Sequence, residues 1–131
     1  EIKKIGNFYQ IDDAYNSNPV GAKGALEVLG SIDGFRVVVT PGMIELGDKE
    51  YELNKEFGRQ ISKIANADLV ILIGKKQTKP ILDGLEEVGF SKSKIQVLND
   101  VRESFTIINN LKEKKDIYAL YENDLPDTYN E

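Results

Sequence analysis

Eight residues near the start of the chain bring together side chains that are well suited to contact a ligand. They read Asp12-Asp13-Ala14-Tyr15-Asn16-Ser17-Asn18-Pro19. The segment follows a run typical of a β-strand and precedes one typical of a helix, so it forms a corner at a strand end. Such loops, held by a rigid sheet, commonly bind ligands. A purely structural interpretation also exists, because Asn18 is a good N-cap and Pro19 a good first helical residue.

Further polar segments follow the other expected strands. They are residues 40–47 (Thr-Pro-Gly-Met-Ile-Glu-Leu-Gly), 74–79 (Gly-Lys-Lys-Gln-Thr-Lys), 99–100 and 122–129. Each has a plainer alternative: Gly42 and Gly47 supply unusual backbone angles to an ordinary loop, Lys75 and Lys76 are a solvated pair, and the last segment packs on the sheet edge.

The hydrophobic pattern predicts regular alternation of strands and helices. The expected strands are residues 4–11, 35–39, 69–73, 95–98 and 117–121, and the expected helices are 19–29, 51–65, 78–88 and 101–111, with Asn18, Thr78 and Asp100 as caps. This order indicates an α/β fold: a three-layer sandwich with a mainly parallel sheet of five or six strands flanked by helices. No internal linker is visible, so we expect residues 1–131 to form a single domain.

Right-handed crossovers would gather the polar segments at one edge of that sheet. No glycine-rich phosphate cradle occurs anywhere in the chain. The rim is rich in acids, namely Asp12, Asp13, Glu45, Glu122, Asp124 and Asp127. A polyphosphate would be repelled there unless lysines or a metal offset the acids, whereas ribose hydroxyls, adenine edges and ammonium groups would be accepted.

Composition excludes several classes of function. The 131 residues carry a net charge of −5, which argues against nucleic acid and anionic membranes as partners, and no apolar run could span a bilayer. Cysteine and histidine are absent, which removes thiol chemistry and the usual zinc ligands. We therefore expect no metal-binding residue in the chain. It also lacks an initiating methionine, and we expect it to be a piece of a longer protein.

The two motifs Asp-Asp-Ala-Tyr-Asn-Ser-Asn-Pro and Pro-Gly-Met-Ile-Glu-Leu-Gly, in this order and spacing, resemble the C-terminal domain of the Mur ligases. The resemblance covers residues 2–129 and is closest to the branch that adds D-alanyl-D-alanine to UDP-N-acetylmuramoyl-tripeptide. It implies a Rossmann-like domain of a three-domain, cytoplasmic, monomeric enzyme of peptidoglycan synthesis. ATP and Mg²⁺ would be held mainly by the central domain, while this domain closes over ATP and positions the acceptor amine for attack on an acyl phosphate.

The resemblance also assigns residues. It implies an ATP- and ribose-facing group of Asp13, Tyr15, Asn16, Asn18 and Pro19. On the cleft and acceptor side we expect Met43, Glu45, Gly47, Lys75, Glu122, Asn123 and Asp124. No catalytic residue is expected in the chain, which alone would be inactive.

One segment departs from the family. A Lys-Gly-Ser-Arg-like segment is common after the last strand of this branch, and the acidic residues 121–127 stand in its place. A related amide ligase with a different acceptor therefore remains an alternative. A free-standing receiver-like or interaction module is another, although the chain has no aspartate after its third strand, where Ile73 runs directly into Gly74 and Lys75.

Overall fold

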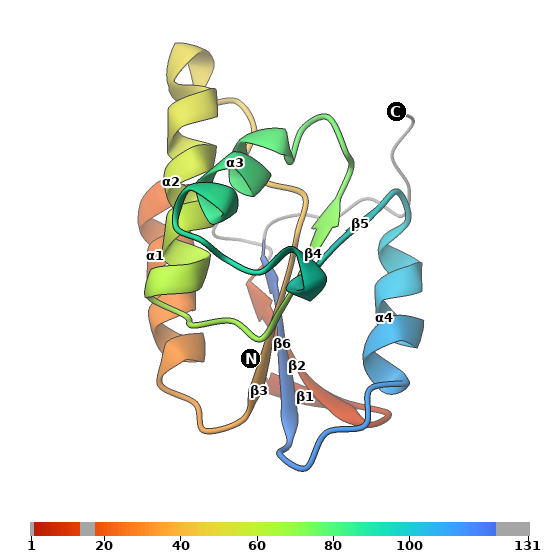
Figure 1. The fold of residues 1–131 in the computed structure, drawn as a ribbon. Helices are drawn as coiled ribbons and strands as arrows, with labels where there is room; N and C mark the ends of the chain where they lie inside the picture. Colours follow the sequence, from red (N-terminus) through yellow and green to blue (C-terminus); the bar gives the residue numbers. More distant parts are fainter. Residues whose placement is uncertain (1, 14–17, 123–131) are drawn as a thin grey trace.

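A six-stranded β-sheet forms the middle layer of the fold, with the strand order β1-β2-β6-β3-β4-β5 (Figure 1). The computed structural model describes residues 2–13 and 18–122. The strands are β1 (Ile2–Ile5), β2 (Phe8–Asp13), β3 (Phe35–Thr40), β4 (Leu69–Ile73), β5 (Ile95–Leu98) and β6 (Ile117–Glu122). Only β1 is antiparallel to its neighbour, and all other pairs are parallel. The expected fold class is confirmed.

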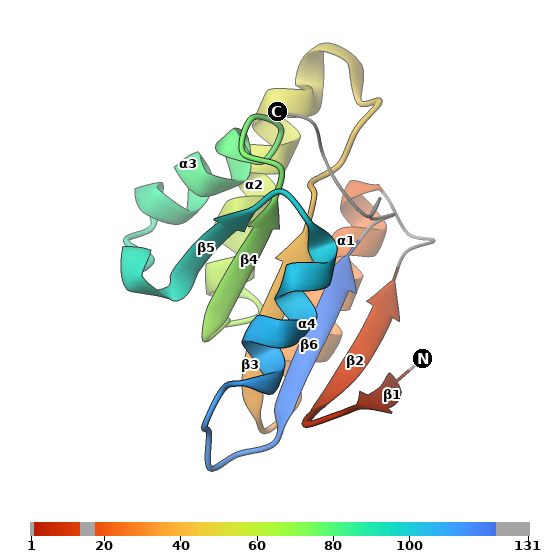
Figure 2. The ribbon, with the colours of Figure 1, turned by 90° about the vertical axis from the view of Figure 1, so that its right-hand side faces the viewer.

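Within residues 2–13 and 18–122, four α-helices cover the two faces of the sheet (Figure 2). They are α1 (Pro19–Gly30), α2 (Glu50–Lys63), α3 (Lys79–Glu87) and α4 (Val101–Asn109), and short 3₁₀ turns occupy Gly47–Lys49 and Lys92–Lys94. Helices α1, α2 and α3 lie on one face and α4 alone lies on the other. No helix within the described residues is both long and apolar enough to cross a membrane.

The chain begins with a hairpin where the sequence predicted one strand. The prediction of a single strand over residues 4–11 is wrong, because Gly6 turns the chain with a φ of 58°. Asn7 then donates its backbone N–H to Asn109 Oδ1 at 2.8 Å and its side-chain amide to the Asn109 carbonyl at 3.0 Å. These bonds fasten the turn to the end of α4. The turn depends on this contact with a residue far along the chain, which no local pattern reveals.

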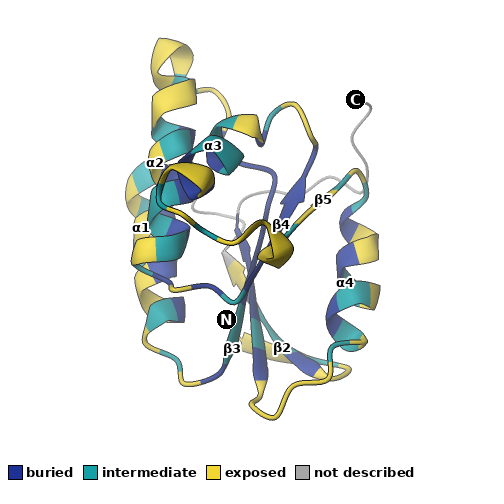
Figure 3. Ribbon diagram, in the orientation of Figure 1, coloured by how far each residue is buried: buried dark blue, intermediate teal, exposed yellow. Residues whose placement is uncertain are grey.

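The core is divided into two clusters by the sheet, one on each face (Figure 3). Strand β4 is buried along its whole length and serves both clusters. Val70 and Leu72 pack with the three-helix side, whereas Ile71 and Ile73 pack with the α4 side. This burial on both faces is the reason why β4 reads as an unbroken apolar run.

Helices α2 and α3 touch backbone to backbone through two glycines. A methyl group added at Gly58 would overlap the Ile81 carbonyl oxygen, and one added at Gly84 would overlap the Lys55 carbonyl oxygen. A side chain at either position would therefore push the helices apart. Because the loops at the carboxyl ends of β3 and β4 lead into these two helices, the close contact also fixes the two loops relative to each other.

Two of the three predicted helix caps are confirmed. Asn18 Oδ1 accepts the Gly21 N–H at 2.8 Å, and Asp100 Oδ1 accepts the Arg102 N–H at 2.9 Å. The prediction for Thr78 is wrong, since its side chain makes no capping bond. The buried Thr78 hydroxyl instead donates to the Gly74 carbonyl at 2.6 Å and closes the turn that precedes α3.

Candidate functional site

The carboxyl ends of the five parallel strands meet at one edge of the sheet, the upper edge in Figure 2. Asp13 at the end of β2 lies in register with Glu122 at the end of β6. Val39 is paired with Tyr121, which places Thr40 beside Glu122 on the next strand. Parallel pairing thus brings together three polar residues that lie far apart in the sequence.

Glu122 has no exposed surface, although the sequence suggested an accessible acid on the rim. It follows Leu120 by two positions on β6, so it lies on the face covered by α1, α2 and α3. Burying a carboxylate is costly unless polar groups stabilise it. Glu122 ends a central strand, so it supports the edge from beneath and is not part of the exposed surface.

The loop of residues 41–47 has an unusual backbone. Gly42, Glu45 and Gly47 have φ angles of 86°, 62° and 68°. The left-handed region strains Glu45, because it carries a Cβ atom. Ile44 is 57% exposed beside it, whereas the Met43 side chain is only 2% exposed and belongs to the core. The loop therefore presents residues 44 and 45 outward, and Met43 lies beneath them in the core.

Asn54 of α2 bonds to this loop, and sequence reasoning missed it. Its Oδ1 accepts the Met43 N–H at 2.8 Å, and its Nδ2 donates to the Met43 and Glu50 carbonyls, each at 2.9 Å. The signal is present in the sequence: Asn54 shares the helical spacing of Phe57 and Ile61, which are core residues. Leu53, the residue before it, is apolar but only half-buried.

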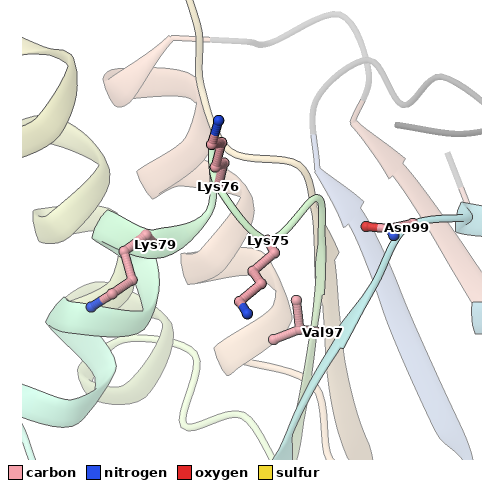
Figure 4. Close-up of a pocket in the computed structure, with 5 residues that line it drawn as sticks. All are labelled: Lys75, Lys76, Lys79, Val97 and Asn99. Carbon is pink, nitrogen blue, oxygen red and sulfur yellow. The ribbon is translucent and has the colours of Figure 1, made fainter. Parts of the chain in front are cut away.

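An open hollow of about 830 Å³ lies at the carboxyl ends of β4 and β5 (Figure 4). It is lined by Lys75, Lys76, Lys79, Val97 and Asn99. Figure 4 shows Lys75 directed toward Val97, while Lys76 and Lys79 extend to other sides. Positive charge therefore surrounds the hollow, and the three ammonium groups do not converge on one point.

One of these lysines is held by a carboxylate on the surface of α3. Lys79 forms an ion pair with Asp83, which also accepts the Tyr51 hydroxyl at 2.7 Å. The Lys79 ammonium, and then the Tyr51 hydroxyl, keep the pKa of Asp83 below its ordinary value. Lys75 is thus the lysine of the hollow that extends toward its apolar wall.

The end of β6 is anchored to α4 by a buried pair of hydroxyls. The Tyr121 hydroxyl lies 2.7 Å from Ser104 Oγ, and its ring stacks on Phe105 with 5.1 Å between ring centres. Burial raises the pKa of Tyr121 to about 12, so the phenol stays neutral throughout the physiological range. This contact fixes the residue immediately before Glu122.

The remaining predicted residues divide into two groups. Asn18 uses its side-chain oxygen as the cap of α1, and Pro19 is the first residue of that helix. Tyr15, Asn16, Asn123 and Asp124 lie outside the described residues. Within residues 2–13 and 18–122, no group of three acidic side chains is close enough together to hold a metal ion.

Comparisons with known proteins agree with this architecture. The model of the Mur ligase, glutamate ligase domain family matches residues 1–120. The chain therefore belongs to the Mur ligase C-terminal domain family.

Its relatives include two UDP-N-acetylmuramoyl-tripeptide–D-alanyl-D-alanine ligases. The Haemophilus influenzae ligase is 34% identical over 75 residues, which is 57% of this chain and 16% of that ligase. The Bacillus subtilis ligase is 39% identical over 76 residues, which is 56% of this chain and 16% of that ligase. This chain thus matches about a sixth of the length of these curated relatives.

Solved structures share the fold at lower identity. A crystal structure of MurF from Acinetobacter baumannii has a TM-score of 0.74 and 23% identity, with 94% of this chain and 26% of that chain covered. MurF from Thermotoga maritima in complex with ADP has a TM-score of 0.71 and 21% identity, with 93% and 26% covered. At such identities the likeness establishes the fold alone.

Proposed function

We propose that the chain, residues 1–131, is the C-terminal domain of a longer, cytoplasmic, monomeric ligase of peptidoglycan synthesis. That enzyme uses ATP to join D-alanyl-D-alanine to UDP-N-acetylmuramoyl-tripeptide. The observation that supports this most strongly is the family match over residues 1–120, together with relatives at 34% and 39% identity that carry this name. The acid-rich carboxyl edge is the surface through which the domain acts.

Nucleotide binding is assigned to the corner after β2. Asp13, Tyr15 and Asn16 supply carboxylate, aromatic and amide groups, which suit ribose hydroxyls and a base; Asn18 and Pro19 fix the start of the following helix. The residues of the edge fit this part of ATP better than its phosphates, because acids outnumber cations there and a glycine-rich cradle is missing from the sequence. The phosphates and Mg²⁺ therefore belong mainly to another domain of the enzyme.

Acceptor binding is assigned to the rest of the edge. Lys75 and its hollow attract the dipeptide carboxylate, and Asp124, which follows β6 in the sequence, attracts its ammonium group. Strands β6 and β4 are separated by β3, which corresponds to ~10 Å at normal strand spacing. An extended dipeptide spans ~7 Å, and a lysine side chain covers the difference.

Further acceptor contacts are proposed from the loop of residues 41–47 and from the chain after β6. They involve Glu45, Gly47 and Asn123, with Met43 and Glu122 as buried supports.

The contribution of the domain to the reaction is positional. The acceptor amine attacks an acyl phosphate, a tetrahedral intermediate forms, and inorganic phosphate leaves as the amide bond is made. Closure of the domain excludes water that would hydrolyse the acyl phosphate, and it holds the amine within reach of the carbonyl carbon. The chain alone is therefore inactive.

The test is ligation by the full-length enzyme with UDP-N-acetylmuramoyl-tripeptide and D-alanyl-D-alanine, followed by ADP release and product mass. Turnover that falls in the Asp13→Ala and Asn16→Ala variants supports both the acceptor and the assigned corner. Unchanged kinetics in both variants would refute the assignment of the corner. Turnover only with a different amino acid or peptide would retain the ligase class and replace D-alanyl-D-alanine as acceptor. The acid-rich segment of residues 121–127 would then account for the different choice of acceptor.

A further inference from the structure

Asn54 is a buried polar residue whose hydrogen-bonding groups are turned toward the site. It is 1% exposed and occupies a core position of α2, where an apolar residue would be the ordinary choice. Burial of an amide is costly unless its groups are bonded, and all three bonds of this side chain go to backbone atoms. Two of the three go to Met43, on either side of its Cα atom.

These two bonds satisfy both backbone groups of Met43, as pairing with a neighbouring β-strand would. One bond satisfies its N–H and the other its carbonyl, so the backbone of Met43 can neither rotate nor leave the core without breaking both. The room for this contact is limited, because a methyl group on Gly42 would lie 3.0 Å from Asn54 Oδ1. The contact with Asn54 therefore requires a glycine at position 42.

Other bonds complete the restraint at the start of the loop. Gln77 Nε2 donates to the Pro41 carbonyl at 2.5 Å, and Thr40 Oγ1 accepts the Gly42 N–H at 3.0 Å. Gln77 stands in the segment that also carries Lys75, so the loop of residues 41–47 and the wall of the hollow are connected directly. Glu45, with its strained backbone, follows two residues after the point that Asn54 holds.

We propose that Asn54 is a positioning residue for the acceptor. By holding Met43, it keeps Ile44 and Glu45 at the edge in the conformation in which the loop lines the acceptor side. This inference rests on the proposed function, since it concerns the acceptor side of the same site. Asn54 makes no contact with the acceptor itself and acts only through the backbone of the loop.

The experiment compares Asn54→Ala with Asn109→Ala in the full-length enzyme. Asn109 is also an amide whose Oδ1 accepts a backbone N–H, that of Asn7, but it holds a turn at the opposite end of the sheet. Both variants should lose thermal stability. Only Asn54→Ala should raise the KM for the acceptor and lower kcat/KM about 10- to 100-fold, because only it releases the loop. The KM for ATP, whose assigned contacts follow β2, should stay the same.

A second readout is hydrogen exchange of the backbone amides of residues 42–47, measured in the same proteins. Exchange should accelerate in Asn54→Ala and not in Asn109→Ala. If Asn54→Ala does not fold, Gln77→Ala replaces it, since its side chain is only half-buried and it removes the bond to Pro41; exchange in the loop should again rise.

The proposal is overturned if the exchange of residues 42–47 is unchanged, or if Asn109→Ala alters acceptor kinetics as much as Asn54→Ala does. Failure of the wild-type enzyme to use D-alanyl-D-alanine would reject the proposed acceptor. The exchange measurement would still decide whether Asn54 holds the loop, so the two failures are distinguishable.

Discussion

Replacing Gly58 with alanine should destabilise the domain, even though alanine favours a helix more than glycine does. The added methyl group would overlap the Ile81 carbonyl oxygen and lie 3.0 Å from the carbonyl carbon. Both atoms belong to the backbone of α3, so no side-chain rotation relieves the clash, and the helices must separate.

The size of the effect follows from two opposing terms. Overpacking of this kind costs about 3 kcal/mol when the neighbours cannot yield, and the gain in helix propensity returns about 1 kcal/mol. The net loss is about 2 kcal/mol of the free energy of unfolding. Gly24 of α1 is the matched control, because a methyl group there would have no neighbour within 4 Å. Gly24→Ala should therefore stabilise the domain by about 1 kcal/mol.

Urea denaturation followed by circular dichroism measures both changes. The midpoint should fall by about 1 M for Gly58→Ala and rise for Gly24→Ala, with little change in the slope of the transition. A Gly58→Ala protein as stable as the wild type would show that α2 and α3 are not in backbone contact. The loops that lead into these helices would then not be fixed relative to each other by this contact.

Three further predictions concern the helix cap, the buried phenol and the hollow. Asn18→Ala should cost about 1 kcal/mol of stability in urea denaturation, because the Gly21 N–H loses its partner; an unchanged midpoint would contradict the cap. The pKa of Tyr121 is raised to about 12, so the stability that its neutral phenol contributes is complete below pH ~10 and is lost as the pH rises through 12. Between pH 8 and 12, the free energy of unfolding should fall by about 2 kcal/mol less in Tyr121→Phe than in the wild type. Equal losses in both proteins would refute this. Lys75→Ala in the full-length enzyme should raise the KM for D-alanyl-D-alanine up to about fivefold, with a smaller effect at high salt; a KM that does not respond would remove Lys75 from the acceptor side.

Local patterns predicted most of the fold. Strands β4 and β5 begin and end where the sequence indicated, because a run buried on both faces and turn residues beside it leave little choice. The caps at Asn18 and Asp100 are likewise local, since each side chain bonds to a backbone group two or three residues ahead. Features that depend on neighbours within one turn of chain were accessible to sequence reasoning.

Features that depend on partners distant in sequence were not accessible to sequence reasoning. The hairpin at Gly6 is fastened by Asn109, whose partner Asn7 lies 102 residues before it. The Thr78 hydroxyl is a local exception, because it bonds back to Gly74, four residues earlier, where a cap was expected. Asn54 was overlooked because an asparagine beside an apolar stripe resembles a solvent-facing residue. Its bonds to Met43, eleven positions earlier, exist only once β3 and α2 are packed together.

The sequence by itself determined the order of strands and helices, the acid-rich edge and the two motifs that indicate the family. Periodicity, capping residues and residue types can be recognised in the sequence without knowledge of the tertiary structure. Only the tertiary structure decided that Glu122 is buried in register with Asp13, that Met43 faces the core while Ile44 faces outward, and which side chains hold the loop. The reason is that parallel strand pairing and helix packing set these positions. Both bring together residues that are far apart along the chain, and no local sequence pattern shows which residues these will be.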